Sequence, residues 1–156
     1  MAQFFRNMSP ERALEKAKWY CSFQERCKNH VQNRLTAWKV EQKHFDAIIE
    51  TLEKEDFLNE KRFTEAYVRG KFLIKKWGKI KITSELYQLS IDKRFINDAI
   101  TTEIDEGDYL KTIKELIEKK IFLLKEIDET KKKEKLYRYL LSKGYESELI
   151  FKLLAL

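Results

Sequence analysis

The sequence predicts an all-α protein made of three tandem three-helix repeats, each like a helix-turn-helix unit, that form an elongated, curved body. Composition is the first observation behind this prediction, because 156 residues include only four Gly and one Pro, which disfavours a turn-rich β-sandwich. The second is an apolar pattern that returns twice along the chain. Units of about 50 residues that stack end to end bury one another's faces, so they extend instead of closing into a sphere.

The first unit is predicted over residues 10–57, and its first helix has a clear opening. Ser9 supplies an N-cap, Pro10 suits the first helical position and Glu11 places an acid in the first turn. The apolar positions of this helix are Ala13, Leu14, Ala17 and Cys21.

Two more helices are expected in the same unit. Ser22 and Glu25 have the spacing of a capping box, which predicts a second helix from Gln24 to about Trp38. A short break at residues 39–41 then leads into a third helix. Its apolar positions, at helical spacing, are Phe45, Ile48, Ile49 and Leu52.

The apolar pattern of the first unit recurs without a gap. A shift of 51 residues takes Val31, Leu35, Trp38, Val40, Phe45 and Ile49 onto Ile82, Leu86, Leu89, Ile91, Ile96 and Ile100. A further shift of 54 residues takes Ile82, Leu86, Ile91, Phe95, Ile96 and Ile100 onto Leu136, Leu140, Tyr145, Leu149, Ile150 and Leu154. A pattern kept in three copies indicates a triple repeat.

Each repeat contains a tight corner between its second and third helices. The apolar residues that follow the corners are Val40, Ile91 and Tyr145, which we expect to fix each turn against the core. The residues that precede them are Lys39, Ser90 and Gly144. Only Gly144 is the residue type preferred at a left-handed C-cap, so the third corner is the best formed chemically.

The second unit is predicted over residues 58–104 and the third over residues 108–156. Residues 103–108 are acidic and contain a glycine, which predicts a flexible joint between these two units. A long helix is expected from about residue 109 to 127, followed by the basic run Lys131–Lys133.

Residues 57–86 concentrate the chemical information of the chain. Phe63, Tyr67 and Phe72 mark one side of a predicted helix that ends near Trp77, and this spacing is typical of core positions. From Arg69 to Lys81 there are six basic residues and no acidic one. Such a segment can face a polyanion or an acidic protein surface. Trp77 either closes the helix against its neighbour or stacks on a partner.

The net charge of +6 is distributed unevenly. Residues 1–81 carry 18 Lys and Arg against 11 Asp and Glu, while residues 82–156 carry 14 against 15. The whole basic excess therefore lies in the first part of the chain, which is compatible with nucleic-acid contact and also with a surface that is basic for solubility.

No residue pattern indicates catalysis, a metal or a cofactor, and the protein is not expected to be an enzyme. The four glycines are isolated, so they form no phosphate-binding loop. Cys21, Cys27, His30 and His44 have a spacing that matches no common zinc pattern, and Cys27 is expected to be a buried structural thiol. The apolar runs are too short to span a membrane, and no signal peptide is recognised, so a cytoplasmic monomer is expected.

The order and spacing of these features resemble the RecX family of bacterial recombinase regulators. The middle unit of that family opens with Leu and two acidic residues, then Arg-Phe-Ala and an aromatic-Val pair, and continues with a basic stretch, Gly and Glu-Leu. The matching residues here are Leu58, Asn59, Glu60, Arg62, Phe63, Thr64, Tyr67, Val68, Gly78, Glu85 and Leu86. The likeness covers about residues 10–154. Departures are Asn59 for Asp, Thr64 for Ala and Ser90 for Gly.

The resemblance implies a regulator of DNA repair by homologous recombination and of the SOS response. It implies binding in the helical groove of the RecA filament on single- or double-stranded DNA, with inhibition of filament extension, strand exchange and co-protease activity, and with weak direct DNA binding. The residues expected to contact the partner or phosphates are Arg62, Arg69, Lys71, Lys75, Lys76, Lys79 and Lys81. Two alternatives stay open: a non-specific DNA- or RNA-binding helical module without a recombinase partner, and a purely structural helical adaptor.

Overall fold

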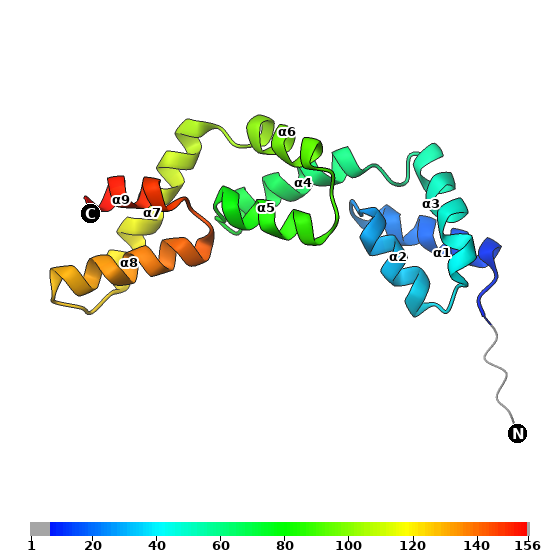
Figure 1. Cartoon of the computed structure of the whole chain (residues 1–156), viewed down its shortest axis with the longest axis horizontal. Coiled ribbons are helices and arrows are strands. Elements are labelled where there is room, and N and C mark those ends of the chain that lie inside the picture. Colours follow the sequence, from blue (N-terminus) through cyan, green and yellow to red (C-terminus); the bar gives the residue numbers. More distant parts are fainter. Residues whose placement is uncertain (1–6, 156) are drawn as a thin grey trace, which may run out of the picture.

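The computed structural model describes residues 7–155, and this part of the chain consists of helices and their connections, with no strand. The elements are α1 (Pro10–Phe23), α2 (Lys28–Ala37), the 3-10 turn η1 (Gln42–His44), α3 (Phe45–Lys54), α4 (Glu60–Leu73), α5 (Lys79–Gln88), α6 (Lys93–Glu103), α7 (Glu106–Leu123), α8 (Glu129–Lys143) and α9 (Ser147–Leu154). They form three consecutive three-helix units along the long axis of the molecule (Figure 1), which confirms the predicted fold class.

The first helix of every unit begins with the same type of side-chain N-cap. A side-chain oxygen of Ser9, Asn59 or Asp105 accepts a hydrogen bond from the main-chain N–H three residues later, at 3.3, 2.9 and 2.9 Å. Each cap satisfies one of the N–H groups that a helix start leaves without an intrahelical partner. The predicted opening at Ser9 is confirmed.

The corner between the second and third helices is also the same in all three units. The main-chain N–H groups of Val40, Ile91 and Tyr145 donate to the carbonyls of Leu35, Leu86 and Leu140 at 3.0, 3.2 and 3.1 Å. All three donors are buried, as predicted. The preceding residues Lys39, Ser90 and Gly144 all adopt positive φ, of 59°, 59° and 95°. The two non-glycine corners thus take the left-handed turn in spite of their Cβ atoms.

The second helix begins later than the sequence predicts. Ser22 lies in the last turn of α1, where its hydroxyl donates to the carbonyl of Trp19 at 2.6 Å, so it caps no helix. Helix α2 starts at Lys28, with Cys27 at the N-cap position. The Cys27 side chain is fully buried, as expected for a structural thiol, and it belongs to the core of the next unit. Cys27 and His30 form a local capping box at this start, which the sequence prediction placed at Ser22 and Glu25.

Two further boundaries differ from the prediction. Helix α4 ends at Leu73, before Trp77, because the chain turns through Lys76 at a φ of 59°. The predicted flexible joint is mostly helical: α6 ends at Glu103, and α7 already begins at Glu106. Between them, Ile104 is buried and Asp105 caps α7, so the acidic residues there mark a helix start.

The buried side chains form two cores. One belongs to α1–α3 and includes Leu35, Ile49 and Leu52. The other is continuous through α4–α9, where it contains Phe63 and Phe72 with Tyr67 packed against it. The aromatic face of α4 is therefore core, as the sequence predicted.

The second and third units share a core because two helix ends meet there. The N–H groups of Gly78 and Ile80, at the start of α5, donate to the carbonyls of Lys143 and Gly144, at the end of α8, at 2.7 and 3.0 Å. The backbones are so close that a Cβ at Gly78 would lie 2.3 Å from the carbonyl of Gly144. A glycine is required at position 78 because of this close approach.

Replacing Ser90 by Gly tests the left-handed corner. The Ser90→Gly variant should have a free energy of unfolding about 0.5–1 kcal/mol higher than the unchanged protein, because Gly adopts positive φ without the Cβ penalty. Chemical denaturation followed by circular dichroism measures this difference. A lower free energy of unfolding for Ser90→Gly would contradict the interpretation that Ser90 is strained at this corner.

Gly78 and Gly70 form a matched pair for testing the contact between α5 and α8. Gly78→Ala should lower the free energy of unfolding by about 1–3 kcal/mol, because its new methyl group collides with backbone atoms. Gly70→Ala should raise it by about 1 kcal/mol, because Gly70 lies inside α4 with no atom within 4 Å of an added Cβ. Equal effects from the two changes, measured by denaturant titration, would rule out the backbone contact as the cause.

Candidate functional site

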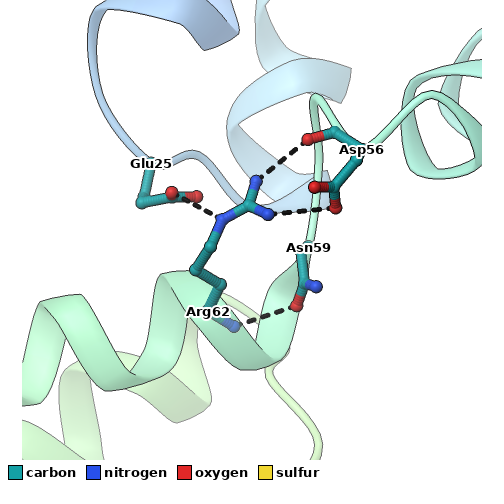
Figure 2. A network of polar contacts seen from close by, with 4 residues as sticks. All are labelled: Glu25, Asp56, Asn59 and Arg62. Carbon is teal, nitrogen blue, oxygen red and sulfur yellow. Dashed lines mark hydrogen bonds and ion pairs between the residues drawn. The ribbon is translucent and has the colours of Figure 1, made fainter.

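The predicted contact residues fall into two groups in the structure, and the first group makes ion pairs within the protein. Arg62 joins the first two units: its Nε donates to Glu25 at 2.6 Å, and its other nitrogens donate to the carboxylate and the carbonyl of Asp56 at 3.0 and 3.1 Å (Figure 2). The hydrogen bond to Glu25 is the main cause that raises the pKa of Arg62. The Arg62 side chain therefore holds the junction between the two cores.

Two more predicted residues are paired with carboxylates. Arg69 makes a two-pronged ion pair with Glu103 of α6, at 3.0 and 3.2 Å, and this pairing raises its pKa. The Lys79 ammonium forms an ion pair with Glu106 of α7 and lies 4.6 Å from the ring centre of Tyr109. These pairs connect helices, so part of the basic charge is already neutralised within the protein.

The second group surrounds Trp77. The ammonium groups of Lys71 and Lys81 lie 4.8 and 4.4 Å from the ring centre of Trp77, which is half-buried against the shared core. Cation–π attraction of this kind holds both ammonium groups near one ring. Trp77 therefore closes α4 against its neighbours, which supports the first of its two predicted roles, and it also positions two charges.

Lys143, at the end of α8, adds a further positive charge near Lys75 and Lys81. Its ammonium donates to the carbonyl of Lys75 at 3.1 Å, and its pKa is lowered by burial and by the charges of Lys81 and Lys75. We call Trp77 with Lys71, Lys75, Lys81 and Lys143 the Trp77 cluster. Among residues 7–155, none of its four ammonium groups forms an ion pair with a carboxylate. Uncompensated positive charge of this kind favours an anionic partner.

Sequence reasoning missed Lys143 because it lies far along the chain from the basic segment. Only the docking of the α8 end onto the α5 start brings it to Trp77. Lys76, which the sequence predicted as a contact residue, has a structural role through its backbone. Its carbonyl accepts a hydrogen bond from the Tyr145 hydroxyl at 2.8 Å. The left-handed turn at Lys76 carries the chain from α4 to α5.

No three side chains of His, Cys, Asp or Glu among residues 7–155 are grouped so as to hold a metal ion. His30 Nδ1 accepts from the N–H of Cys27 at 3.5 Å, which helps to start α2. In this range, no helix combines the length and the apolar character needed to cross a membrane.

Comparison with known proteins agrees with this architecture. Residues 59–100 match the family model for the second three-helix domain of RecX, and residues 106–154 match the model for the third. Together the two models account for more than half of the chain. The chain belongs to the RecX family. The resemblance drawn from residues 58–86 and from the three corners is therefore confirmed.

Similar proteins are named as regulatory proteins. The chain is 31% identical over 121 residues to "Regulatory protein RecX" of Clostridium beijerinckii, a match that covers 76% of this chain and 55% of that protein. It is 32% identical over 117 residues to the protein of the same name from Clostridium perfringens, covering 74% of this chain and 54% of the relative. The chain thus spans about half the length of these RecX relatives.

Two solved structures share the fold. The crystal structure of RecX from Lactobacillus salivarius superposes with a TM-score of 0.78 at 24% identity, covering 94% of both chains. A second crystal structure of a regulatory protein RecX gives a TM-score of 0.85 at 20% identity, covering 94% of this chain and 72% of that one. At these identities the likeness establishes the three-unit architecture of this RecX-family chain.

The lowered pKa of Lys143 provides a direct test of anion binding at the Trp77 cluster. A phosphate at the cluster favours the charged ammonium, so a short single-stranded oligonucleotide should raise the pKa of Lys143 toward the ordinary lysine value. A pH titration of the lysine side-chain resonances by NMR, with and without oligonucleotide, measures this shift. Lys93, which is exposed on α6 outside the cluster, is the control. An unchanged Lys143 would show that phosphates do not reach the cluster.

Proposed function

We propose that this RecX-family protein regulates the RecA recombinase by binding in the helical groove of the RecA–DNA filament. Bound there, it inhibits filament extension, strand exchange and the co-protease activity. It would act in the cytoplasm, in homologous recombination, DNA repair and the SOS response. It requires no cofactor, because inhibition of this kind needs only binding.

The Trp77 cluster is the observation that carries this proposal. Its four ammonium groups come from α4, α5, α8 and the connection between α4 and α5. The charge of Lys143 is disfavoured in the free protein by burial and by the charges of Lys81 and Lys75. An anionic partner offsets the repulsion among these lysines. The relief of this repulsion adds to the free energy of binding. The phosphates of filament DNA and acidic side chains of the recombinase are both suitable anions.

The shape of the molecule also supports a filament as the partner. The three units follow one another along the long axis (Figure 1), so the protein presents an extended surface on which different units can touch neighbouring subunits. The Trp77 cluster lies where the second and third units meet, which places the charge away from either end of the chain.

The decisive experiment is a titration of RecA ATP hydrolysis on single-stranded DNA. Sub-stoichiometric amounts of the protein should lower the hydrolysis rate, because blocked filament extension removes many active subunits for each molecule bound. A rate that stays constant up to equimolar protein would overturn the proposal.

Charge reversal of the Trp77 cluster tests the proposed contact surface. The double variant Lys75→Glu, Lys81→Glu should need about tenfold more protein for half-maximal inhibition, because two phosphate or carboxylate contacts become repulsive. The double variant Lys93→Glu, Lys114→Glu is the matched control, since it makes the same total charge change at exposed sites outside the cluster, on α6 and α7. If the control loses as much inhibition as the Lys75→Glu, Lys81→Glu variant, net charge and not the cluster is responsible.

The Trp77 cluster also suits the alternative of a non-specific DNA- or RNA-binding module. In that case the protein should bind bare single-stranded DNA, with an affinity that falls steeply between low and moderate salt. The Lys75→Glu, Lys81→Glu variant should reduce the slope of log K against log salt by about 2, or about 1 for each lysine. Tight, salt-sensitive binding to bare DNA without any effect on RecA would favour this alternative.

A further inference from the structure

A groove between the first two units adjoins the Trp77 cluster and shares Lys71 and Lys75 with it. It has a volume of about 370 Å³ and runs along α4, with its other wall formed by the connection between α1 and α2. Tyr67, Gly70 and Ile74 line its α4 side, and Glu25 and His30 line the side of the first unit. We call it the α4 groove. Because its walls belong to units with separate cores, an occupant would touch both units.

Gly70 has no role in packing within the protein. It lies inside α4, and an added Cβ would meet no atom within 4 Å. Helix propensity disfavours Gly at such a position. Gly78 and Gly144, by contrast, are required by close backbone contacts. The missing side chain of Gly70 leaves the α4 side of the groove open.

The groove is apolar in its floor and positive along its edge. Ile74, which lines the groove, is 77% exposed, so an aliphatic side chain remains uncovered at the end of α4. A single exposed apolar side chain is ordinary, but this one lies in a groove. Lys71 and Lys75 line the same groove.

The remaining titratable groups that face the groove contribute little charge of their own. The Glu25 carboxylate is paired with Arg62, and burial lowers the pKa of His30, which keeps its imidazole neutral near pH 7. Burial raises the pKa of Tyr67 to about 12, so its hydroxyl stays protonated. The charge presented to an occupant therefore comes from the two lysines, and it is positive.

The aromatic rings of the groove offer little surface for stacking a nucleobase. Phe63 is only 4% exposed. The Tyr67 ring lies against Phe63, with ring centres 5.6 Å apart, and the Lys71 ammonium lies 5.3 Å from its centre. Base stacking requires an open ring face. The aliphatic surface of Ile74 and the opening at Gly70 fit an aliphatic side chain better.

We propose that the α4 groove binds a protein segment that inserts an apolar side chain over Gly70 and places an acidic side chain against Lys71 or Lys75. This inference rests on the proposed function, since the segment would belong to the recombinase filament. The groove then supplies the apolar contact, Lys71 and Lys75 serve both surfaces, and Lys81 and Lys143 remain for a further anion. Apolar anchors in pockets with charged rims are typical of interface hot spots.

Two substitutions at the same position give the test. Gly70→Leu fills the groove from α4 with a good helix former, whereas Gly70→Ala gives the same gain in helix propensity without filling it. Binding of each fluorescently labelled protein to RecA filaments assembled on single-stranded DNA is measured by anisotropy. We expect Gly70→Leu to weaken binding at least tenfold and Gly70→Ala to change it less than twofold. Ile74→Ser, which removes the exposed aliphatic contact, should weaken binding about threefold to tenfold.

The outcomes separate the two proposals. If the unchanged protein does not bind the filament, the proposed function is overturned, and the groove loses its partner with it. If the unchanged protein and Gly70→Leu bind equally well, the groove proposal alone is overturned. If Gly70→Leu loses affinity for a bare single-stranded oligonucleotide as strongly as for the filament, the occupant is nucleic acid, which also overturns the proposal of a protein segment.

Discussion

The contact between the start of α5 and the end of α8 is the interaction on which the middle and end of this molecule depend. Helix starts leave N–H groups without partners, and helix ends leave carbonyls without partners. Here N–H groups at the start of α5 donate to carbonyls at the end of α8. The opposed partial charges of the two helix ends add to the attraction. Gly78 and Gly144 allow the backbones to approach closely enough for these bonds. The second and third units consequently share one core.

The same contact assembles the proposed binding surface. Lys143 reaches the carbonyl of Lys75 because its own carbonyl is held by Gly78. Trp77 then lies between the docking point and α4, with Lys71 and Lys81 over its ring. Charge and fold are therefore coupled: a change that separates α5 from α8 would also disperse the four ammonium groups. Repulsion within the cluster is a cost of assembling it that an anionic partner removes.

The first unit is attached by a different kind of contact. Its core is separate, and the connection relies on the buried Cys27 and on the ion pairs of Arg62 with Glu25 and Asp56 (Figure 2). Polar junctions of this type leave space between the units, and the α4 groove is that space. The protein thus presents a cationic cluster and an adjoining groove that adds apolar surface and shares Lys71 and Lys75 with the cluster.

The sequence by itself determined the all-α class, the three repeats and the family, because buried apolar positions must recur at helical spacing and because helix caps are local. Val40, Ile91 and Tyr145 could be placed at buried corners for that reason. The tertiary structure alone decided which basic residues have no carboxylate partner within the protein and so remain available to a binding partner. Arg62, Arg69 and Lys79 look the same as Lys71 and Lys81 in the sequence, but their carboxylate partners come from other helices or connections of the chain. Lys143 joins the cluster through contacts between residues distant in the chain, which no local pattern encodes.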